Sequence, residues 1–266
     1  MNTLQNLTIA ALASLAVSAS SIAAPVDLSS WSPLTLNFAG GQPAGSWSLE
    51  PGNTAVTQTV NADPSFYLNN LNQTAFSMDG SWQVNTTSDD DFMGFVFGYQ
   101  NSSNFYLFDW KQGNQSYSGG TATAGMTLKK YTGGTGDGLT DLSLGEFWEN
   151  NNDMGDMTIL AQNQGSGKGW MDNVLYDFHL DFLQNPNEIH IVVMQGATTL
   201  WDVTVYDSTF SSGQFGFYNY SQSTVRYAGF EQTGGVIVDV SAPAALGLLG
   251  FGLAGLGVAR RRRSVN

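Results

Sequence analysis

Three consecutive carboxylates, Asp89, Asp90 and Asp91, are the residues whose type and spacing most clearly predict chemistry in this chain. They stand directly before the alternating aromatic run 92–99. Adjacent carboxylates repel one another, so a folded chain relieves them with water or with a hard cation. Calcium takes about 6–8 oxygen ligands and needs no nitrogen or sulfur. The run therefore predicts a calcium site, and the alternative is a solvated acidic turn.

Two further aspartates are weaker candidates for the same site. Asp63, in the Asn-Ala-Asp-Pro segment 61–64, would either add a calcium ligand or shape an Asx turn. Asp109 lies between aromatic residues of an expected strand, where it would face the same site or pair with Lys111. The calcium hypothesis therefore includes Asp63 and leaves the role of Asp109 open.

The two histidines of the chain receive different interpretations. His179 alternates with Asp177 and Asp181, which places all three on one face of a strand. Such a row would hold a transition metal or a proton, or it would form the polar outer face of a sheet, which is the interpretation we prefer. His190 lies within the apolar run 189–194, which predicts a core position.

Patterns typical of enzymes are weak in this sequence. A retaining sandwich glycosidase needs two carboxyl groups about 5–5.5 Å apart in a cleft. Glu146 and Glu149, near Trp148, are the best pair, but neither stands in the Glu-Xaa-Asp-Xaa-Glu strand pattern familiar from such enzymes. A nucleophile elbow, a His-Glu-Xaa-Xaa-His helix and a phosphate loop are also missing. We therefore expect no enzyme, with a polysaccharide hydrolase as a remote alternative.

Strands are the elements that must position these residues. Aromatic and apolar residues recur at every second position between turns of Gly, Asn, Ser and Thr, and Met93, Phe95, Phe97 and Tyr99 are expected on one face. By contrast, residues 133–169 predict a long surface excursion with one short helical turn or strand at 157–161. The period of two indicates an all-β antiparallel sandwich with strands at 34–38, 55–60, 76–84, 93–99, 105–110, 123–131, 176–182, 189–195, 199–205, 210–220 and 225–231.

The charge of the chain limits its partners. All 22 acidic residues lie between Asp27 and Asp239, whereas four of the nine basic residues stand at 260–263. The central part therefore carries 5 − 22 = −17, which argues against nucleic acid or an anionic membrane as partner. There is no cysteine, so disulfides, zinc–thiolate sites, iron–sulfur clusters and thiol catalysis are excluded. This composition suits a soluble extracellular domain.

The N-terminus predicts export. Residues 1–23 read as a signal peptide whose apolar stretch is followed by small residues, with cleavage expected near Ala23, ahead of Pro25. The segment is atypical because no Lys or Arg precedes its apolar stretch.

The C-terminal tail has three parts. An uncharged span at 242–259 just reaches the length that can cross a bilayer, and a basic cluster follows that would stay on the cytoplasmic side. Residues 241–266 resemble the PEP-CTERM sorting signal of Gram-negative bacteria, which exosortases cut during export to the cell surface or matrix. This implies transient anchoring in the inner membrane; the alternative is a permanent anchor. The sorting residues are Ser241, Ala242 and Pro243, in place of Pro-Glu-Pro, and Arg260, Arg261, Arg262 and Arg263.

Ordered blocks of residues between about 46 and 231 resemble the thrombospondin C-terminal domain. The strongest block is 89–117, a second runs from Gly169-Trp170 through Ile191-Val192-Val193-Met194, and a third covers 207–217. The resemblance implies a lectin-like, concanavalin-type jelly-roll β-sandwich over 25–235 that binds calcium through Asp89, Asp90 and Asp91. It departs from the family at Ala62, where a cysteine is common, and in lacking Asp-Xaa-Asp repeats before Ser46.

Together these observations predict an exported calcium-binding sandwich, flanked by a signal helix and a transmembrane sorting helix. Adhesion or assembly of an extracellular matrix or biofilm, through a surface glycan or protein, is the expected role. The alternative is a lectin for bacterial exopolysaccharide, in which exposed Trp148, Trp170 and Tyr220 stack on sugar rings. Against this, some of these aromatic residues would be core residues, and a core position is the one we expect for Trp170.

Overall fold

The computed structural model describes residues 25–238. The predicted signal peptide, 1–23, and the predicted sorting tail, 241–266, lie outside the described residues. Within the described part of the chain, no helix has the length and apolar character needed to cross a membrane.

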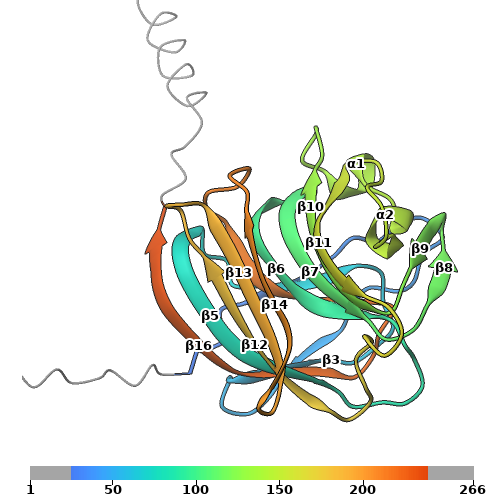
Figure 1. Ribbon diagram of the computed structural model, residues 1–266, viewed down its shortest axis with the longest axis horizontal. Helices are drawn as coiled ribbons and strands as arrows, with labels where there is room; N and C mark the ends of the chain where they lie inside the picture. Colours follow the sequence, from blue (N-terminus) through green and yellow to red (C-terminus); the bar gives the residue numbers. More distant parts are fainter. Residues whose placement is uncertain (1–24, 239–266) are drawn as a thin grey trace, which may run out of the picture.

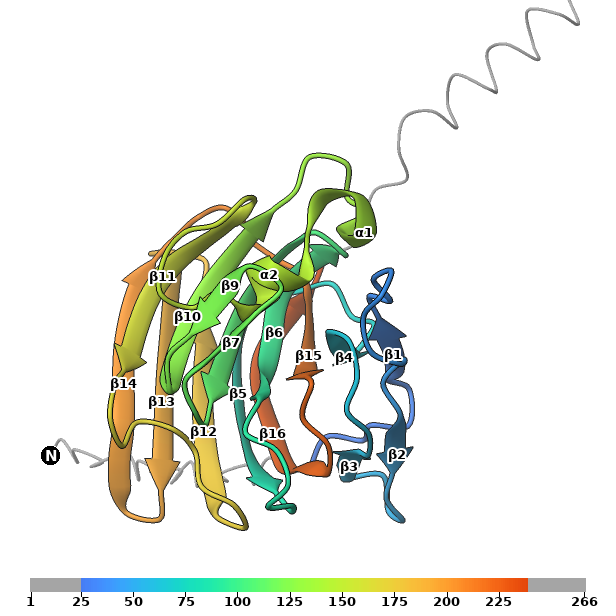
Figure 2. The same cartoon turned by 90° about the vertical axis from the view of Figure 1, so that its right-hand side faces the viewer.

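Two seven-stranded antiparallel sheets face each other (Figures 1 and 2). The first contains, in spatial order, β1 (Ser32–Thr35), β4 (Ser65–Leu68), β15 (Gln214–Tyr220), β6 (Phe92–Asn101), β7 (Asn104–Lys111), β10 (Gly125–Thr132) and β11 (Met157–Gln164). The second contains β14 (Thr198–Tyr206), β13 (Glu188–Gln195), β12 (Leu175–Phe182), β5 (Gln73–Val84), β16 (Val225–Ile237), β3 (Ala55–Gln58) and β2 (Trp47–Leu49). The predicted all-β sandwich is confirmed.

The main core lies between the two sheets because alternate residues of each strand point inward. Trp82 of β5 stacks on Phe178 of β12 with ring centroids 4.9 Å apart, and Phe95 of β6 lies over the same ring at 4.9 Å. All three side chains are buried. Aromatic pairs of this kind add about 0.5–1.5 kcal/mol beyond the area that they bury.

Tyr99 lies on the opposite face of β6 from Phe95 and Phe97, so its predicted position is wrong. The ladder between β6 and β7 shifts register between Phe97 and Asn101, and Gly98 adopts a positive φ of 58°. A bulge of this kind turns the following side chain to the other face. Tyr99 consequently packs in a second apolar cluster, on the outer face of the first sheet.

That outer face is covered by the chain after β7. A small hairpin, β8 (Gln115–Tyr117) with β9 (Gly120–Ala122), and two short helices, α1 (Gly138–Asp141) and α2 (Leu144–Trp148), lie over it (Figure 2). Ser143 begins α2 by accepting a hydrogen bond from the Glu146 amide (3.3 Å) and donating to its carboxylate (2.7 Å). Phe147 and Trp148 then point into the cluster and are buried. The predicted surface excursion is therefore wrong for this part: it covers a second core.

Beneath α2 lies a fully buried ion pair. Lys129 of β10 places its Nζ 2.6 Å from Asp109 Oδ2 of β7 and 3.0 Å from the backbone oxygen of Phe147. Burial raises the pKa of Asp109 to about 6 against the pull of Lys129, and burial lowers the pKa of Lys129. The partner of Asp109 is thus Lys129 rather than Lys111, because the neighbouring strand brings a second lysine to the same covered face.

Candidate metal centre

The acidic run is positioned by the hairpin of β6 and β7. Phe92 and Lys111 face each other in this ladder, so the residues just before β6 lie against the end of β7. The Lys111 ammonium is 2.9 Å from Asp90 Oδ1, 2.7 Å from Asp91 Oδ1 and 2.7 Å from the Asp90 backbone oxygen. Lys111, at the end of β7, therefore contacts the acidic residues that directly precede β6.

The Lys111 side chain is completely buried. Its Nζ lies over the rings of Phe92 (5.7 Å) and Trp148 (5.2 Å), which shield it from water. One ammonium offsets one of the three carboxylates, and −3 + 1 leaves −2 when all are ionised. This residual charge is equal in magnitude and opposite in sign to the charge of one divalent cation.

Asp91 faces inward, towards Lys111. It is 3% exposed; its backbone nitrogen donates to Gln222 Oε1 (3.0 Å) and its backbone oxygen accepts from Trp170 Nε1 (3.0 Å). Burial raises the pKa of the Asp91 carboxyl to about 6, although the Lys111 ammonium opposes the shift. Asp91 is therefore mainly the counter-ion of Lys111.

Asp89 and Asp90 line an open recess of about 270 Å³ that Thr87, Ser88 and Gln112 complete, although Asp90 also contacts Lys111 through Oδ1. Carboxylate oxygens of the three aspartates lie within 4.8 Å of one another. Asp90 Oδ2 lies over Gly113, where an added Cβ would be 2.3 Å away, so the turn leaves room for the carboxylate only because residue 113 has no side chain. Carboxylate and amide oxygens are the protein donors that Ca²⁺ prefers, so Asp89, Asp90 and Gln112 fit calcium.

Asp63 is not part of this group. Its side chain is buried, and its two oxygens accept hydrogen bonds from the backbone amides of Phe38 (2.9 Å) and Gln42 (2.7 Å). Burial raises the pKa of Asp63, and these two amides oppose the shift. The nearby Asn61 instead reaches the acidic run, donating its side-chain amide to Asp89 Oδ2. Asp63 thus holds the loop before β2, and Asn61, which like Asp63 lies between β3 and β4, ties the β3–β4 loop to the site.

The remaining sequence candidates lie elsewhere. Trp148, Trp170 and Tyr220 are only 1–2% exposed, so the role of exposed sugar-stacking rings is wrong for them, and the core position expected for Trp170 is confirmed. Glu146 and Glu149 are also buried. Glu146 accepts from the Asp156 amide (2.8 Å), and Glu149 accepts from the amides of Thr121, Asn151 and Asn152 (2.8–3.0 Å). Both carboxylates stabilise the loops around α2.

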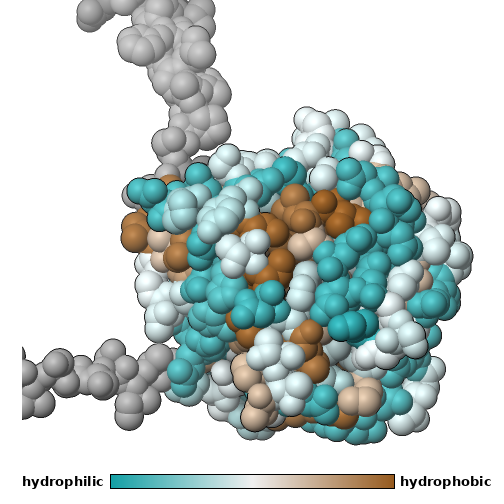
Figure 3. All heavy atoms as spheres, viewed as in Figure 1, coloured by the Kyte–Doolittle hydropathy of each residue, from teal (hydrophilic) through white to brown (hydrophobic). Residues whose placement is uncertain are grey.

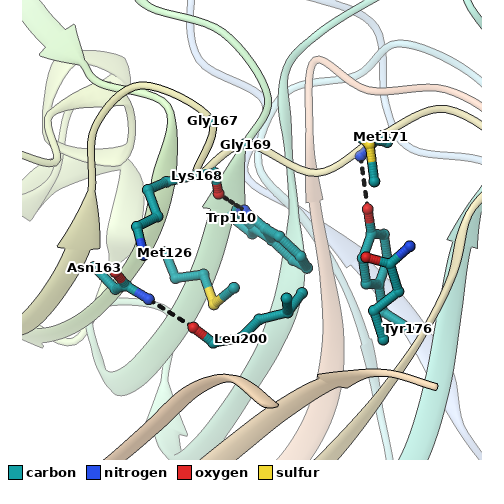
Figure 4. A pocket seen from close by; sticks show the side chains of 10 residues that line it. Trp110, Met126, Asn163, Gly167, Lys168, Gly169, Met171, Tyr176 and Leu200 are labelled. Atoms are coloured by element: carbon teal, nitrogen blue, oxygen red, sulfur yellow. Dashed lines mark hydrogen bonds between the residues drawn. The ribbon is translucent and has the colours of Figure 1, made fainter. Parts of the chain in front are cut away.

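A second cavity, also of about 270 Å³, opens between the edges of the two sheets (Figure 4). Its polar groups largely satisfy one another: Trp110 Nε1 donates to the Lys168 oxygen (2.7 Å), and Asn163 donates to the Leu200 oxygen (3.0 Å). In Figure 3 hydrophobic residues gather at the centre of the face shown, with hydrophilic residues on both sides. This opening is an apolar gap at the margin of the main core.

Comparison with known proteins identifies the family to which this chain is similar. A family model described as the thrombospondin C-terminal region matches residues 42–233. Thrombospondin-1 of Xenopus laevis and thrombospondin-2 of Homo sapiens are each 32% identical over 190 residues, covering 68% of this chain and 16% of the relative. The chain therefore corresponds to a small part of the curated relatives that it matches.

Solved structures with a similar fold include carbohydrate-binding proteins. The carbohydrate-binding module CBM66 from Bacillus subtilis aligns with a TM-score of 0.48 at 12% identity, over 74% of this chain and 100% of the module. The VIP36 exoplasmic/lumenal domain, in its Ca²⁺/Man3GlcNAc-bound form, aligns with a TM-score of 0.48 at 10% identity, over 81% and 87%. The family match spans most of the described sandwich, so the sequence resemblance to the thrombospondin C-terminal domain is confirmed: the chain belongs to the family of the thrombospondin C-terminal region.

Proposed function

We propose that this protein is an exported, calcium-binding sandwich of the cell surface or extracellular matrix. The observation that carries the proposal is the residual charge of −2 at Asp89, Asp90 and Asp91 after Lys111 has offset one carboxylate. The recess beside Asp89 and Asp90 is open to solvent and presents oxygen donors, which supports a hard divalent cation there.

The proposed role of calcium is structural. Asp89 is tied to Asn61, and the backbone oxygen of Asp90 accepts from the amide of Gln112 (3.1 Å), so three loops already meet at the recess. A cation held by Asp89 and Asp90 would offset their mutual repulsion and fix these loops at one end of the sandwich. We propose that this rigid end contacts a matrix glycan or protein in adhesion or matrix assembly.

Calcium is expected to stabilise the protein, and the Asp90→Asn substitution should remove the effect. A ligand that binds only the native state adds about 2.7 kcal/mol when its free concentration is a hundred times the dissociation constant. Urea unfolding in chelator and through a calcium titration measures this gain. Asp177→Asn, which removes an exposed carboxylate on β12, is the matched control and should retain the full gain. An equal response to calcium in wild type and Asp90→Asn would contradict the assignment.

Export is proposed from the two ends of the chain. We infer that the signal peptide directs the chain across the inner membrane and that a PEP-CTERM-type tail is removed there by an exosortase-like enzyme. Mass spectrometry of surface-associated protein should then give a chain that begins near residue 24 or 25 and ends before Arg260. Replacing Arg260–Arg263 with serine should reduce this processing. A mature protein that retains the arginines would support a permanent anchor instead.

A further inference from the structure

The two histidines of the chain lie next to each other on the outer face of the second sheet. His179 on β12 and His190 on β13 have ring centroids 6.0 Å apart, and each ring is partly exposed. The predicted core position of His190 is wrong, because its neighbours Ile189 and Ile191 take the inward positions of β13. The strands that carry this cluster, β5, β12, β13 and β14, are adjacent in the sheet (Figure 1).

Asp181 stands between the two rings. Its Oδ2 is 3.1 Å from His179 Nε2 and 3.4 Å from His190 Nδ1. Its other oxygen, Oδ1, accepts a hydrogen bond from the Ser77 hydroxyl, which leaves Oδ2 directed at the imidazoles. One carboxylate oxygen and two ring nitrogens therefore converge on one point of the surface, with all three donor atoms within 4.8 Å of one another.

The outward nitrogen of each ring meets a further carboxylate. His179 Nδ1 is 2.7 Å from Asp79 Oδ1 of β5, and His190 Nε2 is 2.9 Å from Asp202 Oδ1 of β14. A neutral imidazole carries one N–H. If the outward nitrogens donate to Asp79 and Asp202, each inward nitrogen turns a lone pair towards Asp181 Oδ2. Three lone pairs facing one another are unfavourable unless a ring takes up a second proton or a metal cation lies among them.

The spacing of these atoms suits a metal. Zinc binds His nitrogen and carboxylate oxygen at about 2.0–2.2 Å in a tetrahedron, which separates neighbouring donor atoms by about 3.3–3.5 Å. The observed separations from Asp181 Oδ2, 3.1 and 3.4 Å, are close to that edge. Metal-bound histidines also usually donate their second N–H to a carboxylate, which is the arrangement of Asp79 and Asp202. Two imidazoles disfavour calcium and magnesium, which prefer oxygen.

We propose that His179 Nε2, His190 Nδ1 and Asp181 Oδ2 bind a divalent transition metal of the zinc class, with Asp79 and Asp202 orienting the two rings. Solvent or an external ligand would take the fourth position, because the cluster lies at the surface. The site is on the second sheet and shares no residue with the acidic run before β6. It joins β12 to β13 and is independent of the proposed calcium site.

The test uses the fact that the chain holds only two histidines. Purified protein without a histidine tag, saturated with calcium, is titrated with Zn²⁺ at a pH above the pKa of both histidines, including the raised pKa of His179, and the imidazole signals are followed by NMR. Both sets of signals should move together and stop changing at one zinc per chain. Co²⁺ in place of Zn²⁺ should give the visible absorption of a low-coordinate cobalt–imidazole centre. Histidine signals that stay in place while zinc binds would overturn the proposal.

Variants separate ligands from orienting groups. His190→Gln and Asp181→Asn should each weaken zinc binding by more than about 100-fold, beyond the loss typical of an orienting group, whereas Asp202→Asn should cost about 10-fold. Asp177→Asn, an exposed carboxylate on the same strand, is the matched control and should bind zinc as the wild type does. Unchanged affinity in both His190→Gln and Asp181→Asn would refute the site. Should a variant fail to fold, the wild-type NMR titration still decides.

Discussion

Lys111→Met is expected to destabilise the protein by about 3–5 kcal/mol in the presence of a chelator, the cost typical of removing one partner from a buried ion pair. The methionine matches the length of the lysine stem but removes the charge from between Asp90 and Asp91. Asp91 is nearly inaccessible to water, so its carboxylate cannot recover by solvation what it loses in pairing. The free energy of unfolding from urea titration measures the loss.

Calcium should recover part of this loss. Without Lys111 no ammonium offsets the run, so a bound divalent cation would supply the counter-charge that Asp90 and Asp91 have lost. We therefore expect a larger calcium-induced stabilisation in Lys111→Met than in wild type. The control is Glu50→Gln, which breaks the partly exposed pair with Arg226 and should cost no more than about 1 kcal/mol, with no change in the calcium response. A Lys111→Met protein as stable as wild type in chelator would show that the lysine does not balance the acidic run.

Asp109→Asn is expected to cost about 3–5 kcal/mol for the opposite reason, since it leaves a buried ammonium without its counter-charge. Lys129 is fully buried, and apart from Asp109 its ammonium contacts the backbone oxygen of Phe147 and the ring of Phe92. A carbonyl dipole and an aromatic face do not replace a full negative charge. Guanidinium unfolding with and without calcium measures this change, and calcium should not alter it, because Asp109 does not line the recess.

The double variant Asp109→Leu with Lys129→Met tests the physical origin of that cost. Replacing both charges by apolar side chains removes the desolvation penalty together with the attraction. The double variant should therefore be more stable than either single substitution, with a coupling of about 0.5–3 kcal/mol, the range typical of residues in contact. Strictly additive losses would mean that the two side chains act through packing and not as an ion pair.

The register of the β6–β7 hairpin decides which acidic residues Lys111 contacts. Asn101 faces Asn104 at the turn, and an uninterrupted ladder from that pair would place Lys111 opposite Gly94. The bulge at Gly98 shifts the ladder by two residues, so Lys111 faces Phe92 and reaches Asp90 and Asp91. Lys111 is thereby paired with the acidic run, and Asp109 pairs instead with Lys129 of the neighbouring strand. The signal for the bulge was a glycine within an aromatic strand, which is typical of such irregularities.

The histidine cluster shows a similar limit. Alternation along β12 correctly placed His179 on the same face as Asp181, because the side-chain period of a strand is two. The residues around His190 are nearly all apolar, so the sequence does not show which of them point into the core. The contact between the two rings also depends on which strand lies next to β12. Strand order follows from the whole sandwich, so no single segment contains it.

The sequence by itself determined the all-β class, most strand positions, the family and the acidic run before β6. These features are local: they depend on residue type, on a period of two and on ordered blocks of similarity. Only the tertiary structure decided that Lys111 balances the run, that α2 buries Trp148 over a second core, that Asp63 holds a loop, and that two histidines from different strands meet. The physical reason is that charge pairing and burial depend on register, bulges and strand order, which bring together residues far apart in the chain.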